Sequence, residues 1–307
     1  MKETYEKRVV IAGGSGFIGR ALVKELRARN YKVVVLTRQR IWRKDGVEEA
    51  VWSPGTIGEW IKHLDRAAAV VNLVGRSINC PHTPENLREI LDSRVESVKT
   101  LALAIDHNPR PPRVWVQAGA IGIYGDCEDV KCDEASPSGN DSLAEICKAW
   151  EKTFFTVPSP KTRRALLRIG MVLGRDGGAL PALDRLTTWF LGGSFGDGRQ
   201  YMSWISLADL TGAFIAAIER EDLSGTYNAV APNPVTNNEF MGDLRRVLQR
   251  PWCPPAPEWA IHIGAKLLKT EPSLALTGCR CVPKRLLESG FTFQYPDLLS
   301  TLRKLYE

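Results

Sequence analysis

Residues 8–28 read RVVIAGGSGFIGRALVKELRA, and this stretch decides the fold. The β-branched run at its start predicts a buried strand, and the apolar spacing over residues 17–28 predicts an amphipathic helix. Glycines stand between the two at positions 13, 14, 16 and 19, and they fit both GxGxxG and GxxGxxG. Such a turn needs residues without a Cβ, because the backbone turns tightly and the helix packs closely on the strand. The pattern predicts the first βα unit of a dinucleotide-binding sheet.

The same alternation continues along the chain. Further strands are predicted over residues 32–36, 67–74, 114–118 and 165–169. Helices are predicted over residues 84–105, 142–155 and 210–219. Strands that alternate with helices predict a Rossmann-type α/β fold, in which a doubly wound parallel sheet is covered on both faces.

Proline and glycine interrupt this rhythm in the second half, most densely over residues 251–257. We therefore expect two parts. The Rossmann domain spans residues 1–175 and also receives about 200–228. A smaller α+β substrate lobe comprises residues 176–199 and 229–307.

Composition excludes several classes of protein. The 307 residues are 44% hydrophobic and 25% charged, as in ordinary globular proteins. No run approaches the roughly 18 apolar residues of a membrane span. The net charge of +6 is spread along the chain, which argues against a nucleic-acid partner. The seven cysteines form no CxxC pair and no zinc-like spacing, so we expect reduced thiols, no metal and a cytoplasmic protein.

The residues after the second predicted strand distinguish NADP(H) from NAD(H). An NAD enzyme usually has Asp or Glu there for the ribose 2′-hydroxyl, whereas this chain has Thr37 and Arg38, and its next acid is Asp45. A guanidinium pairs well with a 2′-phosphate. The densest basic cluster of the chain also lies here and comprises Arg38, Arg40, Arg43 and Lys44. NADP(H) is therefore the expected cofactor, although a solvated arginine at a strand end is the alternative interpretation.

Longer motifs run nearly from end to end of the chain. They are GGSGFIG at 13–19, TR at 37–38, VNLVG at 71–75, SRVES at 93–97, AIGIYG at 120–125, WE at 150–151, RIGMVLGRDGGAL at 168–180, GDGRQYMSWISLADL at 196–210, YNAVAPNPVTNNEF at 227–240 and PKRLLESGFTF at 283–293. Through them the chain resembles the extended short-chain dehydrogenases/reductases. More narrowly, it resembles an atypical epimerase-family group with a C-terminal domain of unknown function.

The resemblance implies an NADP(H)-dependent epimerase or oxidoreductase that acts on a small carbonyl- or sugar-like substrate. The implied cofactor contacts are Gly13, Gly14, Ser15, Gly16, Phe17 and Ile18 at the pyrophosphate, Thr37 and Arg38 at the 2′-phosphate, Leu73, Val74 and Gly75 after the fourth strand, and Glu89 and Arg94 on the long helix. For Leu73 and Val74, packing at an ordinary strand end is an equally good interpretation.

The proton-handling residues of the superfamily are missing. Its Tyr and Lys share one helix face at i and i+4, and a Ser holds the substrate. When the helix is aligned on Glu151, these two positions fall at Leu143 and Cys147, and the Ser position falls at Gly119 or Ala120. The accompanying Asn falls at Arg94. The resembling group shares this pattern, which puts ordinary reductase chemistry in doubt.

Substitutes are available at several positions. Candidate catalytic residues are Tyr124, Glu145 and Cys147, whose alternative roles are packing, solvation and core filling respectively. Candidate substrate contacts are Arg76, Ser77, Arg199, Gln200 and Trp204. Two functions stay open: an enzyme with a non-standard proton donor, and a non-catalytic NADP(H)-binding sensor or partner-binding protein. By analogy with extended family members, the helices over 84–105 and 142–155 are expected to form the seam of a homodimer.

Overall fold

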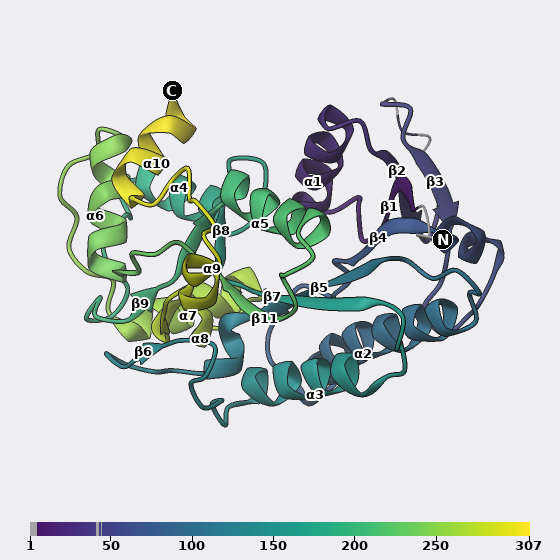
Figure 1. The fold of residues 1–307 in the computed structure, drawn as a ribbon. Coiled ribbons are helices and arrows are strands. Elements are labelled where there is room, and N and C mark those ends of the chain that lie inside the picture. Colours follow the sequence, from purple (N-terminus) through teal and green to yellow (C-terminus); the bar gives the residue numbers. More distant parts are fainter. Residues whose placement is uncertain (1–4, 41–42, 44) are drawn as a thin grey trace.

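A seven-stranded, fully parallel sheet forms the centre of the molecule (Figure 1). The computed structural model describes residues 5–40, 43 and 45–307. In spatial order the strands are β11 (Gly225–Ala229), β7 (Arg163–Ile169), β5 (Val114–Ala120), β4 (Ala67–Asn72), β1 (Glu6–Ala12), β2 (Lys32–Thr37) and β3 (Glu48–Val51). The chain order reverses between β1 and β4, which makes their carboxyl ends the switch point where ligands bind in such sheets. The predicted Rossmann-type α/β fold is confirmed.

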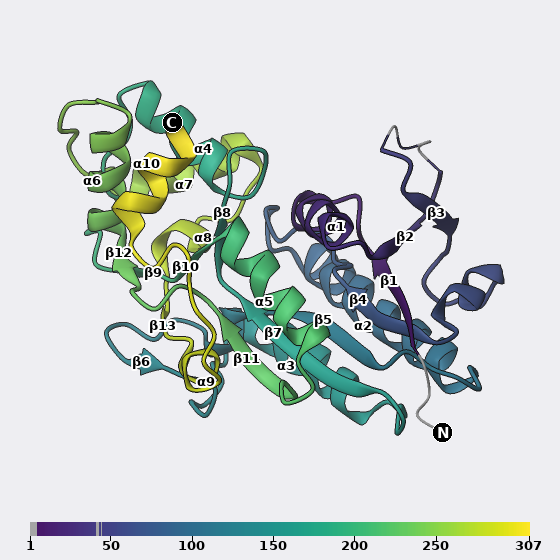
Figure 2. The same cartoon turned by 45° about the horizontal axis from the view of Figure 1, so that its top comes forward.

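Two helical layers cover this sheet (Figure 2). Helices α1 (Phe17–Ala28) and α5 (Leu207–Glu219) pack together on one face, and α2 (Pro84–Asp106) and α3 (Ser142–Thr156) pack together on the other. Every residue of β4 is buried as a result. The one-turn 3₁₀ segment η2 (Ile121–Tyr124) follows β5, and a second, η1 (Glu59–Leu64), precedes β4. None of the helices in the described part of the chain combines the length and apolar character needed to cross a bilayer.

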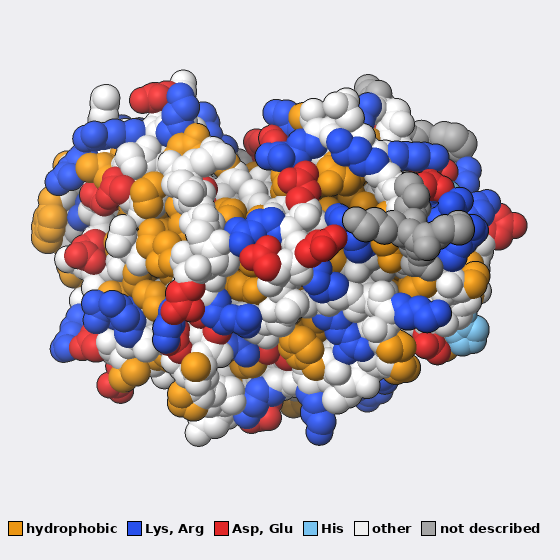
Figure 3. Space-filling view, viewed as in Figure 1, with side chains coloured by type: hydrophobic (Ala, Val, Ile, Leu, Met, Phe, Trp, Pro, Cys, Tyr) orange, Lys and Arg blue, Asp and Glu red, His pale blue; other side chains and the backbone are white. Residues whose placement is uncertain are grey.

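A second hydrophobic core lies away from the N-terminal strands. Trp204, Phe240 and Leu302 are fully buried in it, and it is separate from the core under the large sheet. Its helices are α4 (Leu180–Thr188), α6 (Asn237–Val247) and α10 (Leu298–Tyr306). Its short strands are β8 (Met171–Leu173), β9 (Tyr201–Met202), β10 (Trp204–Ser206) and β12 (Val235–Thr236). A notch separates this lobe from the α1 side at the upper edge of Figure 3, while the domain boundaries given above stay a prediction.

The C-terminal segment contacts the loop that follows η2. It contains α7 (Glu258–Leu268), α8 (Ser273–Leu276), β13 (Arg280–Cys281) and α9 (Lys284–Glu288). Strand β13 pairs in parallel with β6 (Lys131–Cys132). Before that, the Glu271 carboxylate accepts a hydrogen bond from the His82 backbone N–H at 3.0 Å. The C-terminal segment thus contacts the chain after β4 and the loop after η2, both of which border the carboxyl edge of the sheet.

Candidate functional site

The glycine turn after β1 is shaped by close approaches of backbone. Gly13 has φ +81°, and a Cβ there would lie 2.9 Å from the carbonyl carbon of Leu73. A Cβ on Gly19 would lie 2.6 Å from the Cα of Gly14. A Cβ on Gly14 would lie 2.9 Å from a methyl group of Val35. Packing between β1, β2, β4 and α1 therefore requires glycine at these three positions.

Gly16 differs, because a Cβ there would meet nothing closer than the Gly13 carbonyl oxygen at 3.5 Å. Gly16 is the N-cap of α1, and no side chain caps the helix. Neighbouring Ser15 is exposed. The first turn of α1 therefore presents its backbone N–H groups and positive dipole end to open space, an arrangement that suits a pyrophosphate.

Phe17 contacts the second lobe. A Cβ on Gly177 would lie 2.6 Å from its ring, and one on Gly174 would lie 2.7 Å from it. The glycines of the turn that follows β8 therefore make room for this aromatic side chain. Phe17 and Ile18 are both half-buried and begin the first turn of α1.

Gly13→Ala is expected to destabilise the fold and to abolish dinucleotide binding. The substitution adds the strain of a left-handed alanine and a clash with the chain after β4, for a combined cost of at least about 2 kcal/mol. Gly290→Ala is the matched control, because Gly290 has φ +76° with nothing within 4 Å of a Cβ. Chemical denaturation and nucleotide titration of both variants measure the difference. Equal losses in the two would show that the approach to Leu73 has no role.

The end of β2 is followed by an exposed arginine, Arg38. No partner is recorded for it among the described residues. Beside it, the Thr37 hydroxyl donates to the carbonyl of Gln39 at 2.8 Å, which closes the strand end into a turn. This turn follows β2, and β2 is the neighbour of β1 in the sheet. Arg38 is therefore available to an anion bound beyond these two strand ends.

The nearest acid in the sequence is already neutralised. Asp45 accepts two hydrogen bonds from Arg43, with Nε–Oδ1 at 3.0 Å and Nη2–Oδ2 at 2.6 Å. This pairing holds the pKa of Asp45 down at about 2. Asp45 therefore does not compensate the charge of Arg38. Lys44, the fourth member of the basic cluster, lies outside the described residues.

The chain after β4 is fixed by a buried amide network. The Val74 N–H donates to Oδ1 of Asn72 at 3.1 Å, and Nδ2 of Asn72 donates to Ser97 and to Gln117, both at 3.0 Å. These three polar side chains are fully buried. The predicted strand over 67–74 ends two residues early because the side chain of Asn72 takes over the hydrogen bonding. Leu73 and Val74 then lie against the glycine turn.

Arg94 contacts the next residues of this loop, Gly75 and Arg76. Its Nη1 donates to the carbonyls of Arg76 and Ile90, each at 3.0 Å. A Cβ on Gly75 would lie 3.1 Å from its guanidinium carbon, and the guanidinium also lies 5.1 Å from the Trp150 ring centre. Burial lowers the pKa of Arg94. Arg94 thus positions the loop after β4, while its implied contact with the cofactor stays a prediction.

Glu89 and Arg76 form an ion pair, and Arg76 also donates to Oδ1 of Asn86 at 2.8 Å. Two residues that were expected to contact different ligands therefore bind each other. Ser77 is exposed, and its hydroxyl oxygen accepts from the Asn79 N–H at 3.1 Å. Its side chain thus caps the turn that follows.

Two of the remaining substrate candidates have structural roles. Trp204 is fully buried in the second core, so its placement does not fit a substrate contact. Nε2 of Gln200 donates to the Ala275 carbonyl at 2.7 Å and ties the glycine-rich segment to the C-terminal segment. Arg199 is exposed, and its side chain forms no hydrogen bond or ion pair with the described residues.

The three catalytic candidates do not meet at an accessible point. The Tyr124 hydroxyl accepts from Nη1 of Arg168 at 2.7 Å and donates to Oδ1 of Asn228 at 2.8 Å. The side chain is buried, and burial raises its pKa far above the usual value. Its proton is therefore held by a protein acceptor, which disfavours its transfer to a substrate.

Glu145 and Cys147 lie on different faces of α3, one exposed and one buried. Glu145 is exposed and pairs with Lys148. Cys147 is buried in the cluster that contains Tyr124, and burial raises the pKa of its thiol to about 12. One candidate therefore lies in solvent, and the other two lie below the surface with tightly held protons.

Sequence reasoning missed the ion pair that organises this region. Arg168 on β7 and Glu151 on α3 form two hydrogen bonds, with Nε–Oε1 at 2.9 Å and Nη2–Oε2 at 2.8 Å. Their side chains are 12% and 9% exposed. A charged residue inside the apolar run 165–169 was the available signal, since a buried arginine needs an acid. This pair and Tyr124 join β7, α3 and η2.

Tyr124→Phe tests whether this tyrosine is catalytic. We expect NADPH binding and any turnover to change by less than about twofold, while stability falls by about 1–3 kcal/mol as Arg168 and Asn228 lose a partner. Tyr295→Phe is the control, and urea denaturation together with initial rates gives both quantities. A hundredfold loss of turnover at unchanged stability would establish Tyr124 as the proton donor.

Comparisons with known proteins agree with this geometry. The NAD dependent epimerase/dehydratase family matches residues 9–148, and a domain of unknown function, DUF1731, matches residues 256–305. The chloroplastic homologue of epimerase family protein SDR39U1 from Arabidopsis thaliana is 38% identical over 305 residues, which cover 97% of this chain and 86% of that protein. This chain belongs to the SDR39U1-like epimerase family. The Bos taurus member is 34% identical and covers 97% of this chain and 99% of its own length.

Solved structures extend the relationship. The human epimerase family protein SDR39U1 (isoform 2), crystallised with NADPH, matches with a TM-score of 0.86 at 31% identity and covers 97% of this chain and 99% of that one. A nucleoside-diphosphate sugar epimerase from Corynebacterium glutamicum matches with a TM-score of 0.78 at 33% identity, over 97% of this chain and 58% of that one. The family resemblance expected from the motifs, including the C-terminal domain of unknown function, is confirmed.

Proposed function

We propose that this chain binds NADP(H) across the carboxyl ends of β1, β2 and β4, with Arg38 at the 2′-phosphate. The observation that carries the proposal is the exposed guanidinium of Arg38, which has no partner among the described residues and follows the strand beside the glycine turn, where the N-terminus of α1 is open. A carboxylate would repel a phosphate at this place, and the first one that follows in the sequence, on Asp45, is already paired with Arg43. The NADPH in the human relative supports the same nucleotide here.

The residues at this place offer the space and the hydrogen-bond donors that NADP(H) requires. Gly16 leaves the space that a pyrophosphate requires, and the first turn of α1 supplies uncapped N–H donors to it. Arg38 matches a phosphate by fork-shaped, charge-assisted hydrogen bonds, and the carbonyl-fixed turn at Thr37 orients it. When bound, the nicotinamide supplies or accepts a hydride.

Binding without turnover is the function that the geometry supports better. The helix positions of the superfamily's Tyr and Lys are occupied by Leu143 and Cys147. Tyr124 is locked between Arg168 and Asn228. Among the described candidates, therefore, none presents a proton at an open surface, and a sensor or partner-binding role needs none.

Redox or epimerase chemistry on a small carbonyl- or sugar-like substrate is the second candidate, and one observation favours it. The C-terminal segment contacts two loops beside the carboxyl edge, through Glu271 to His82 and through the Ala275 carbonyl to Gln200. It thereby draws the loop after β4 toward the segment that carries Arg199. A substrate lobe built in this way suits a ligand with a carboxylate or phosphate.

Titration of the purified protein with NADPH, NADP⁺, NADH and NAD⁺ tests the cofactor. We expect at least tenfold tighter binding of the phosphorylated pair, and equal or reversed preference would remove the proposal. NADPH absorbance in the presence of a panel of carbonyl compounds and nucleotide sugars then separates the two functions. Stereospecific hydride transfer to any of them favours the enzyme, whereas bound and unreactive NADPH favours the binding protein.

A further inference from the structure

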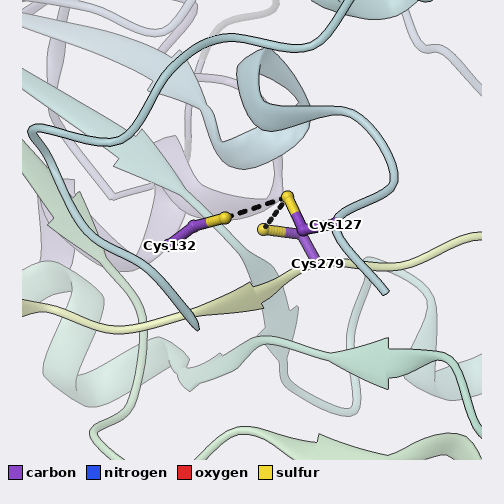
Figure 4. Close-up of side chains that lie close together, drawn as sticks. All are labelled: Cys127, Cys132 and Cys279. Carbon is purple, nitrogen blue, oxygen red and sulfur yellow. Dashed lines mark hydrogen bonds between the residues drawn. The ribbon is translucent and has the colours of Figure 1, made fainter. Parts of the chain in front are cut away.

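Three cysteine thiols from two distant parts of the chain converge in one cluster (Figure 4). The Sγ atoms of Cys127 and Cys132 lie 2.9 Å apart, and those of Cys127 and Cys279 lie 3.5 Å apart. All three sulfur atoms lie within 4.8 Å of one another. Cys132 and Cys279 are buried, and Cys127 is half-buried. None of the three takes part in the NADP(H) site described above.

Backbone contacts hold the three thiols together. Strand β13 pairs with β6 so that Cys281 stands beside Cys132, and the Cys127 N–H donates to the Gly278 carbonyl at 3.1 Å. The buried Ser203 hydroxyl donates to the Cys279 carbonyl at 2.5 Å and accepts from the Cys281 N–H at 2.8 Å. The sulfur atoms are therefore placed by a rigid frame, as a metal site requires.

A fourth cysteine, Cys281, lies near the three thiols, and a surface pocket gives access to them. Cys281 is fully buried, stands two residues after Cys279 and belongs to the same buried cluster as the three thiols. On the open side, Cys127 and Cys132 line a surface pocket of about 350 Å³. Asp126 and Glu128 line the same pocket, so its mouth favours a cation over an anion.

We propose that Cys127, Cys132 and Cys279 bind a thiophilic metal ion of the Zn²⁺ type, with Cys281 or a solvent molecule as the fourth ligand. Zinc–thiolate bonds of about 2.3 Å place tetrahedral sulfur ligands roughly 3.8 Å apart, which small side-chain rotations reach from the separations found here. Binding replaces three S–H bonds by three S–metal bonds and releases three protons to solvent. A disulfide would join two of the sulfur atoms and leave the third without a role.

An ion at this position would tie the C-terminal segment to the loop after η2. That segment continues from the contacts with His82 and Gln200 into β13. The metal would therefore stabilise the C-terminal lobe against the Rossmann domain, while the glycine turn and Arg38 lie outside its reach. This inference does not depend on which nucleotide the protein binds.

Zinc binding to the full-length protein, reduced and freed of metal by a chelator, tests the site. We expect one equivalent of Zn²⁺ in competition with a chromogenic chelator, and more than tenfold weaker binding in Cys127→Ser and in Cys279→Ser. Cys253→Ser is the control, because Cys253 lies in a different pocket beside Phe190. Circular dichroism and thermal unfolding establish that each variant is folded.

Cobalt provides a second readout that needs no variant. Co²⁺ added to the wild-type protein is expected to give a thiolate-to-metal charge-transfer band, which Zn²⁺ then abolishes. The absence of this band would overturn the proposal, as would unchanged Zn²⁺ affinity in the two cluster variants. A Cys127–Cys132 disulfide that forms in air, found by mass spectrometry in protein that takes up no metal under reducing conditions, would overturn it as well.

Discussion

Arg38→Ala is expected to weaken NADPH binding by roughly ten- to a hundredfold and to leave NADH binding nearly unchanged. Hydrogen bonds to a charged group contribute about 1.5–3 kcal/mol, and every 1.4 kcal/mol corresponds to about a factor of ten in affinity. The side chain of Arg38 is exposed and has no recorded partner in the described part of the chain, so its removal should cost the fold little. Isothermal titration with both nucleotides measures the effect directly.

Arg303→Ala serves as the control for this experiment. Arg303 is an exposed arginine on α10, in the second lobe and away from β2. Its loss changes the net charge equally, so any general electrostatic attraction of the nucleotide would fall in both variants. A comparable drop in the two, or an equal loss of NADH and NADPH binding in Arg38→Ala, would show that Arg38 does not read the 2′-phosphate.

The sheet and the glycine turn were predictable because their signals are local. Helix α1 spans the predicted residues 17–28, and β2 ends one residue beyond its expected limit. A parallel strand that is buried on both faces is a nearly continuous apolar run, and a tight turn against a neighbouring strand favours glycine. Both demands are written within a few consecutive residues, as they are at Gly13 and Gly19.

The second lobe was predicted in outline only, because its elements depend on tertiary contacts. Strands β9, β12 and β13 have two residues each, which is too short for any periodicity to appear. Helix α6 did carry a local signal, since Thr236 and Glu239 form a reciprocal capping box at its start. Trp204 is a candidate substrate contact by sequence, yet it is fully buried in the lobe's core.

Proton-handling groups and thiols could not be placed from the sequence, because their partners lie far along the chain. The acceptor for the Tyr124 hydroxyl is Asn228, which is 104 residues away. Cys127 and Cys279 are 152 residues apart and form no spacing motif. Burial by such distant residues sets the protonation of a side chain, and residue type alone does not reveal it.

Glu151→Ala is expected to be the most destabilising of these substitutions, at about 3–5 kcal/mol. Removal of the carboxylate leaves the guanidinium of Arg168 almost buried without an acid, and that uncompensated charge dominates the loss. The pair joins β7 to α3 and also holds the hydroxyl of Tyr124. The free energy of unfolding, measured by chemical denaturation, is the appropriate readout.

Glu145→Ala is the matched control on the same helix. Its ion pair with Lys148 is exposed, so its loss should cost less than about 0.5 kcal/mol. The double variant Glu151→Leu with Arg168→Met removes both charges and should regain much of the lost stability, because neither partner is then left buried alone. If the double variant is as unstable as the sum of its two single variants, packing around the pair, and not its charge, holds β7 against α3.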